Sequence, residues 1–325
     1  TKTAIMIVGY LNDCTKITEP YLSCINSRMK FAAIDIGTNA VRLLIKEVNI
    51  IDGAYEVRKV SFTRVPLRLG EDVFETGRIS NKKARNLVKV MRAFWYLMDV
   101  YGIEWFRVCA TSAMREAKNV DEVCQLVLRE ANVKIELIKG QEEADLIFRN
   151  FSVATYKSNS DFLYIDVGGG SLELTLIRDG KRIRGQSFKI GTIRTMKGMV
   201  EDGEWDAVAE FVKHVSDGSD KIMSIGTGGN INRIQRLIRN PKNAPISLSK
   251  IEEMKDTLKA YSFEDRVEKF SLKPDRADVI VPAAEIYIRI MKLAGSNKII
   301  VPKVGLCDGI ILKIHEEYLA SKKEG

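Results

Sequence analysis

The chain has 325 residues, of which 45% are hydrophobic and 29% charged, a composition typical of soluble globular proteins with up to two domains. No apolar run approaches the roughly 20 residues that span a bilayer, so we expect no membrane partner. Lysine and arginine exceed aspartate and glutamate by 51 − 43 = 8, which suits an anionic substrate or a solvated basic surface. We expect no nucleic-acid partner.

The cysteines and histidines exclude several kinds of site. The five cysteines show no C-x-x-C spacing, so we expect free thiols in a reducing cytoplasm. His214 and His315 lie in helix-like stretches, and surface or capping positions are expected for both. A Ser-His-Asp triad and a histidine-rich metal site are therefore disfavoured.

The first half of the chain alternates strands and helices. Residues 1–28 are expected to be a leader or extension, because their apolar patch has neither a basic segment before it nor a clear cleavage site. Ser80 is a candidate N-cap for a helix reaching about Tyr101, with a buried face expected at Ala84, Leu87, Val88, Met91, Trp95 and Met98. The remaining expected elements are a hairpin over 31–48, strands over 55–69, 105–110 and 133–138, and helices starting near 119–121 and at 140.

The second half repeats this plan after a polar link at 157–160. Ser249 and Glu252 are a candidate capping box for one of its helices. The other expected elements are a hairpin over 162–178, a strand near 189, a helix over 205–215, a strand over 221–225, a helix after 229, a long helix after 275, a strand over 299–301 and a closing helix ending near 320. Alternation of strands and helices predicts an α/β fold.

Two copies of a strand–Asp-x-Gly–strand pattern organise the chain. In the first copy, Asp35 precedes Gly37, Thr38 and Asn39; in the second, Asp166 precedes Gly168, Gly169, Gly170 and Ser171. The aspartates lie 166 − 35 = 131 positions apart, and a third glycine turn contains Gly228. Glycine permits positive φ and close approach of a ligand, and exposed amides in such turns bind anions. The pattern predicts two similar halves that face each other across a phosphate group.

Several charged residues near these turns have both a structural and a functional interpretation. Glu142 and Glu143 open a predicted helix, where acids complement the helix dipole or one of them, kept ionised by that dipole, activates a water. Arg115 follows a strand and is either a surface ion-pair partner or a phosphate ligand. Glu173, like Asp166, suits a metal or water beside a phosphate loop better than the phosphate itself.

Other nucleotide and nucleophile motifs are absent from the sequence. There is no G-x-x-x-x-G-K-[ST] and no G-x-S-x-G around Ser171. The Gly168-x-Gly170 start of a dinucleotide fingerprint continues with Glu173 in the place of the third glycine and leads into a strand. A covalent acyl or phosphoryl enzyme is therefore disfavoured.

Five segments resemble, in order and spacing, the motifs of the exopolyphosphatase and guanosine pentaphosphate phosphohydrolase family. They are residues 31–45, 109–118, 140–148, 164–176 and 225–234. The resemblance covers about 29–320 and implies two ribonuclease-H-like domains of the actin-like ATPase superfamily with an interdomain cleft. It implies a first domain of 29–156 joined by about 305–325, and a second domain of 157–304. Its implied reaction is removal of the terminal phosphate from polyphosphate or guanosine pentaphosphate, the choice between them staying open.

The resemblance also implies roles for individual residues. Glu143 is similar to the general base, Asp166 and Glu173 to acids that hold water or metal, and Asp35 to a residue that shares the metal, Mg²⁺ or Mn²⁺. The implied phosphate ligands are Gly37, Thr38, Asn39, Arg115, Gly168, Gly169, Gly170, Ser171 and Gly228. The family pattern is broken at Cys307 and Asp308, where Arg and Glu are usual, and at Ala283 and Ala284, where glycines are common.

Two other classes of function stay open. One is an ATP-dependent phosphotransferase similar to sugar or acetate kinases, and the other is a non-catalytic polyphosphate or nucleotide sensor. The acids Glu143, Asp166 and Glu173 argue against a sensor, because binding alone does not need acids beside a polyanion. The chain stops before the C-terminal helical domain of longer family members, which implies a preference for short polyphosphate unless a homodimer lengthens the groove.

Overall fold

The computed structural model describes residues 29–51, 54–150, 161–179, 181–216, 222–241 and 244–322. The expected leader at 1–28 and link at 157–160 lie outside the described residues. In the part of the chain that is described, no helix is both long enough and apolar enough to cross a membrane.

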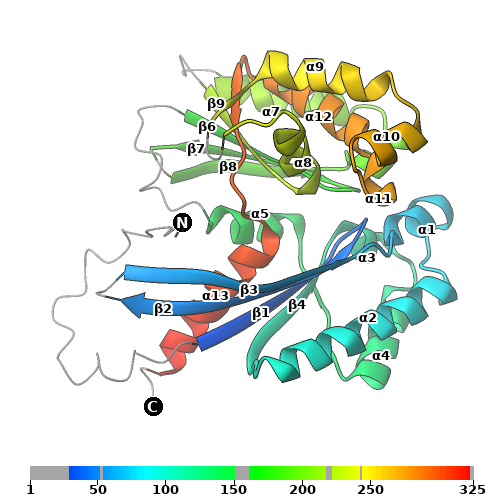
Figure 1. The fold of residues 1–325 in the computed structure, drawn as a ribbon, viewed down its shortest axis with the longest axis vertical. Helices are drawn as coiled ribbons and strands as arrows, with labels where there is room; N and C mark the ends of the chain where they lie inside the picture. Colours follow the sequence, from blue (N-terminus) through cyan, green and yellow to red (C-terminus); the bar gives the residue numbers. More distant parts are fainter. Residues whose placement is uncertain are drawn as a thin grey trace.

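The first sheet has the strand order β3-β2-β1-β4-β5 (Figure 1). Its strands are β1 Met29–Ile36, β2 Val41–Ile51, β3 Ala54–Val65, β4 Trp105–Ala110 and β5 Glu136–Leu137. β1, β2 and β3 are antiparallel, whereas β4 and β5 run parallel to β1. Side chains alternate between the faces of a strand, so Ala32 and Ile34 of β1 join one core while Phe31 and Ala33 join another.

The second sheet repeats this arrangement in the order β10-β11-β9-β6-β7-β8. Its strands are β6 Asp161–Val167, β7 Leu172–Arg178, β8 Lys181–Phe188, β9 Ile222–Thr227, β10 Ile246–Ser247 and β11 Lys298–Ile300. β6, β7 and β8 are antiparallel and β9 and β11 are parallel to β6, as in the first sheet. The predicted α/β class and the predicted repeat of two similar halves are confirmed.

Helices cover both sheets, and two of them lie between the sheets (Figure 1). The first sheet is covered on one face by α1 Leu69–Thr76, α2 Asn81–Val100, α3 Ser112–Glu116 and α4 Val120–Ala131. The second sheet packs with α6 Thr192–Met196, α7 Glu204–Ser216, α8 Gly229–Leu237, α9 Leu248–Lys259, α10 Phe263–Lys269, α11 Pro274–Ala277 and α12 Ile280–Leu293. The two helices between the sheets are α5 Gly140–Phe148 and α13 Leu306–Ser321.

Helix α13 joins the first sheet although it comes last in the chain. Its residues Ile310 and Ile314 share a core with Phe31 and Ala33 of β1. We therefore propose the division stated above, with about 305–325 added to the first domain. Tyr164 of β6 is in the same core, so the two halves share apolar contacts beneath the cavity described below.

Three local predictions were wrong. Trp95 is 38% exposed, because Phe94 fills the buried position of α2 next to Met91. His315 is buried, not at the surface. The cap of α9 is Ser247, whose Oγ accepts from Lys250 N at 3.4 Å, not Ser249.

The long helix expected after residue 275 is divided into α11 and α12. Pro282 lies in the first turn of α12, where its missing N–H costs no helical hydrogen bond. The N-cap prediction for α2 is confirmed, since Ser80 accepts from Lys83 N. Cys109, Cys124 and Cys307 are free thiols, as predicted.

Candidate active site

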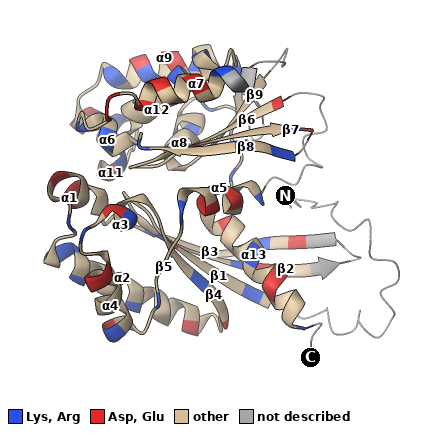
Figure 2. Cartoon of the chain, turned by 180° about the vertical axis from the view of Figure 1, so that it is seen from behind, with Lys and Arg blue, Asp and Glu red and all other residues tan. Residues whose placement is uncertain are grey.

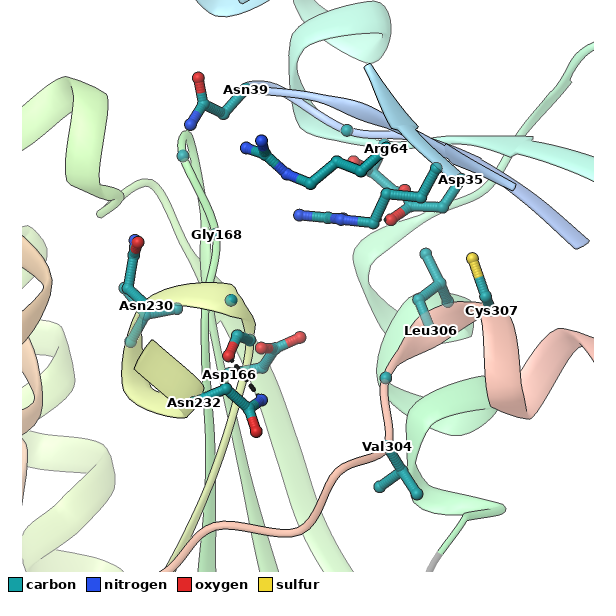
Figure 3. Close-up of a pocket in the computed structure, with 18 of the residues that line it drawn as sticks. Asp35, Asn39, Arg64, Asp166, Gly168, Asn230, Asn232, Val304, Leu306 and Cys307 are labelled. Carbon is teal, nitrogen blue, oxygen red and sulfur yellow. Dashed lines mark hydrogen bonds and ion pairs between the residues drawn. The ribbon is translucent and has the colours of Figure 1, made fainter. Parts of the chain in front are cut away.

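A cavity of about 520 Å³ lies between the two halves and contains most of the predicted site residues. Those that line it are Asp35, Gly37, Thr38, Asn39, Glu143, Asp166, Gly168, Gly169, Ser171, Glu173 and Gly228. Asp35 and Arg64 extend from the first sheet toward the space that Asp166 borders from the second (Figure 3). Arg115 and Gly170 do not line this cavity.

The carboxyl groups of Glu143, Asp166 and Glu173 all line the cavity. Glu143 lies in the first turn of α5, between the two sheets, where the ribbon in Figure 2 is red for acidic residues. Burial, and then the charge of Glu173, raises the pKa of Glu143 well above its ordinary value. Burial, followed by the charge of Asp166, raises the pKa of Glu173 to about 7. Burial and the charge of Glu173 act against the helix dipole, which was expected to keep Glu143 ionised.

Arg115 positions Glu143 through hydrogen bonds. Its Nη1 donates to the carbonyl of Ile138 at 2.7 Å and to Glu143 Oε2 at 3.1 Å. The carbonyl comes from the residue after β5, so the arginine fixes the start of α5 relative to the first sheet. This contact counteracts part of the rise in the pKa of Glu143. The geometry places Arg115 next to the candidate base rather than at the cavity wall.

A row of charged residues that the sequence analysis did not identify crosses the first sheet beside Asp35. Asp35 pairs in register with Arg42, and Arg42 with Arg64. Arg42 forms an ion pair with Asp35, and Arg64 with Asp275 from the second half. Burial, and then the charges of Arg64 and Arg42, lowers the pKa of Arg276 to about 10. This end of the cavity therefore favours an anion.

The next row along the same face is apolar. Leu44 pairs in register with Phe62, and both line the cavity. Phe62 is 51% exposed, which leaves an aromatic surface open beside the arginines. Leu306 and Val304 border the same cavity from the start of α13 (Figure 3).

The glycines of the second turn are required for close packing rather than for positive φ. None of Gly168, Gly169 and Gly170 has positive φ, whereas Gly228 has φ of 105°. A Cβ on Gly169 would lie 2.8 Å from Thr38 Cγ2 of the first turn. The two turns therefore approach each other directly, and a side chain at Gly169 would separate them.

The two departures from the family pattern have different structural surroundings. Asp308 Oδ2 accepts from Gly305 N at 2.8 Å, and Asp308 also pairs with Lys46, so it caps α13. Cys307 lines the cavity, and burial raises the pKa of its thiol. Ala283 and Ala284 are buried in α12 and do not line the cavity.

The carboxylates suit a divalent cation in their chemistry. Asp35 and Asp166 line the same cavity, and carboxylate oxygens are the ligands that Mg²⁺ and Mn²⁺ prefer. Burial raises the pKa of Asp166 to about 6, and the charge of Asp35 adds to the rise. A bound cation would oppose this rise by favouring the ionised carboxylate. Among the described residues, no three acidic, histidine or cysteine side chains form a preassembled metal cluster.

The fold and this site define a two-sheet α/β protein in which glycine turns and carboxylates face one cavity. The Ppx/GppA phosphatase family matches residues 48–317, and the chain belongs to this family. A crystal structure of the Aquifex aeolicus member of the family is 25% identical, with a TM-score of 0.70, over 90% of this chain and 99% of that one. The predicted fold of two ribonuclease-H-like halves is thereby confirmed.

Three relatives show the range of proteins to which the chain is similar. Exopolyphosphatase 1 of Mycobacterium bovis is 24% identical over 88% of both chains. The guanosine-5'-triphosphate,3'-diphosphate pyrophosphatase of Aeromonas hydrophila is 26% identical over 86% of this chain and 58% of its own. The bifunctional 3-dehydroquinate synthase/phosphatase of Fusobacterium nucleatum is 28% identical over 87% of this chain, which spans 46% of that protein.

Proposed function

We propose that the protein hydrolyses the terminal phosphoanhydride of inorganic polyphosphate, guanosine pentaphosphate or both. The observation that carries the proposal is a single cavity in which Glu143, Asp166 and Glu173 face two glycine turns. The exopolyphosphatase and the guanosine pyrophosphatase named above support the same choice of substrates. A kinase or a sensor is not favoured by these relatives.

The chain's own residues account for the main steps of this reaction. Backbone amides of the turn at Gly168–Ser171 bind the terminal phosphate, and Asn39 and Gly228 border it. Glu143 takes a proton from a water as the water oxygen attacks the terminal phosphorus, and its raised pKa makes it a stronger base. The bridging P–O bond breaks, and the shortened chain leaves with the bridging oxygen.

A divalent cation has a defined place in this scheme. Asp166, with Asp35, would hold Mg²⁺ or Mn²⁺. The ion would supply neutralisation of charge on the phosphate oxygens. The arginines at positions 42, 64 and 276 would bind phosphates further along the substrate. We further propose a cytoplasmic location, because the free thiols at Cys109, Cys124 and Cys307 suit a reducing compartment.

The experiment that tests the proposal compares phosphate release from three substrates under one set of conditions. Polyphosphate, guanosine pentaphosphate and ATP with candidate acceptors are each incubated with the protein and a divalent cation. Release of orthophosphate from either of the first two supports the proposal. Transfer from ATP to an acceptor, with no release from the others, would indicate a phosphotransferase and contradict it.

The row formed by Leu44 and Phe62 favours a nucleotide as one substrate. A purine stacked on the exposed ring of Phe62 would leave its phosphates beside Arg42 and Arg64, and stacking of a base on an aromatic side chain contributes about 1–3 kcal/mol. We therefore expect Phe62→Ala to lower kcat/KM for guanosine pentaphosphate about tenfold or more, with little change for polyphosphate.

A control for this variant is Phe106→Ala, because Phe106 is also exposed and does not line the cavity. It is expected to leave both substrates unaffected. An equal loss on polyphosphate and guanosine pentaphosphate for Phe62→Ala would show that the ring does not select the nucleoside.

A further inference from the structure

The carbonyl groups of Gly168, Gly169 and Gly170 all accept hydrogen bonds from the same helix. Thr192 N donates to Gly168 O at 3.0 Å and Ile193 N donates to Gly169 O at 2.9 Å. Arg194 Nε donates to Gly170 O at 2.7 Å. All three donors belong to α6, which therefore supports the whole turn.

These hydrogen bonds fix the direction in which the N–H groups of the turn point. In a planar trans peptide, the N–H of one residue points opposite to the C=O of the residue before it. Because the carbonyls of residues 168–170 point toward α6, the N–H groups of residues 169–171 point away from it. Gly169 and Ser171 line the cavity, so the amides that bind an anion depend on the contacts made by α6.

Arg194 also binds the other half of the molecule. Its Nη2 forms an ion pair with Glu116 of α3, and Glu116 Oε1 accepts from Ser112 Oγ at 2.9 Å. The guanidinium carbon lies 4.1 Å from the ring centre of Phe74 in α1. Arg194 is only 5% exposed, so its charge is compensated mainly by these contacts across the two halves.

We propose that Arg194 is a positioning residue that links phosphate binding to contact between the two halves. One guanidinium binds both the last carbonyl of the turn and Glu116. The turn is therefore held in its anion-binding form most firmly while the halves are together. Binding of a phosphate to the turn then favours the closed arrangement, and separation of the halves weakens the phosphate site. The inference rests on the proposed function, in which this turn binds the terminal phosphate.

Two variants separate the two contacts of Arg194. Arg194→Met removes both, and we expect it to weaken orthophosphate binding about tenfold and to lower kcat/KM about 100-fold, mainly through kcat. Glu116→Gln keeps the contact with Gly170 but removes the charge that holds the halves together. It should raise KM about fivefold and leave kcat within about twofold, because saturating substrate restores closure.

Lys197→Ala is the matched control. Lys197 follows α6 and pairs with Glu75 across the same interface at 2.9 Å, yet it does not contact the glycine turn. It should leave orthophosphate binding, kcat and KM within about twofold of the wild type. Arg194→Lys provides one donor group on a flexible stem, so an intermediate recovery is expected.

The readouts are orthophosphate affinity by calorimetry, kcat and KM measured separately, and the unfolding midpoint of each variant. Wild-type orthophosphate affinity, kcat and KM in folded Arg194→Met would overturn the inference, as would failure of the wild type to bind orthophosphate. If Lys197→Ala loses as much orthophosphate affinity and activity as Arg194→Met, the loss reflects only a weakened interface, and the inference is wrong. If the wild type binds orthophosphate but releases none from any substrate, the proposed function fails while the binding comparison still decides the role of Arg194.

Discussion

The two strand–turn–strand elements of the molecule have the same spacing but opposite charges at one position. Arg42 follows Asp35 by seven residues and is its cross-strand neighbour. Glu173 follows Asp166 by seven residues and is its cross-strand neighbour. In the first half the aspartate is neutralised by an arginine. In the second half it faces Glu173, whose pKa is raised to about 7 by burial and then by the charge of Asp166.

This difference assigns different chemistry to the two halves. The ion pair between Asp35 and Arg42 fixes the position of the arginine. Arg64, its neighbour on the next strand, adds a second positive charge to the same side of the cavity. Neighbouring acids with raised pKa values suit proton transfer near neutral pH. The duplicated pattern therefore gives the cavity a basic side, formed by Arg42 and Arg64 of the first half, and an acid side, formed by Asp166 and Glu173 beside the phosphate-binding turn of the second half. Helix α5 of the first half adds Glu143 to the acid side.

The largest expected effect comes from removing the base on the acid side. Glu143→Gln keeps the shape of the side chain but cannot accept a proton from water, and general-base assistance contributes roughly 10²–10⁴ in rate. We expect kcat to fall by about that factor, with substrate binding retained, as measured by phosphate release and by calorimetry.

Glu142→Gln is the control for this variant. Glu142 is the neighbouring acid in the first turn of α5, and it pairs with Arg107 and Lys313 away from the candidate base position. It should retain activity within about twofold. Equal losses in both variants, or activity of Glu143→Gln within a few-fold of the wild type, would place the base elsewhere.

A second test compares the two aspartates as metal ligands. Asp166→Asn should raise the concentration of Mg²⁺ needed for half-maximal activity by about 10–100-fold, the usual cost of losing a ligand or its support. Asp35→Asn should have a smaller effect, because Arg42 already neutralises this carboxylate. Chelation with EDTA should abolish activity in the wild type.

Cys109→Ser is the control in the metal titration, since Cys109 neighbours Asp35 in the sheet but does not line the cavity. Its metal requirement should match that of the wild type. A larger shift for Asp35→Asn than for Asp166→Asn would reverse the comparison between the halves, and full activity after EDTA treatment would remove the metal from the proposal.

The sequence predicted the residues of the acid side better than those of the basic side. Asp166, Glu173 and Glu143 lie beside glycines or at a helix start. These neighbouring residues are enough to suggest a function for each acid. Arg42 has the same spacing from its aspartate as Glu173, yet it reads as an ordinary polar residue in an alternating strand. Its partnership with Arg64 depends on the register between β2 and β3, which contains a bulge that no local pattern indicates.

Two further features lacked any local signal. Helix α1 begins after Arg68, which has φ of 52° and makes no side-chain capping hydrogen bond, so the usual N-cap pattern is absent. Arg194 acts through a backbone carbonyl and through Glu116, 78 residues away in the sequence. Such roles arise only when the two halves pack together, whereas strands, glycine turns and helix starts follow from neighbouring residues.

The smallest expected effect concerns the stability of the first half at acid pH. His315 of α13 packs edge-on against Phe31 at the start of β1, with ring centres 5.3 Å apart, and burial lowers the pKa of His315 from 6.5 to about 4. Because the unfolded chain binds this proton more readily, the folded state loses stability as the pH falls below about 6.5. We expect a loss of about 1 kcal/mol from this group between pH 7.5 and 5.5, approaching about 3 kcal/mol below pH 4. His315→Phe keeps an aromatic ring against Phe31 and cannot be protonated, so its free energy of unfolding, measured in urea at several pH values, should fall less over this range. Parallel pH curves for the variant and the wild type would show that His315 does not contribute to the acid sensitivity of the half that holds Asp35.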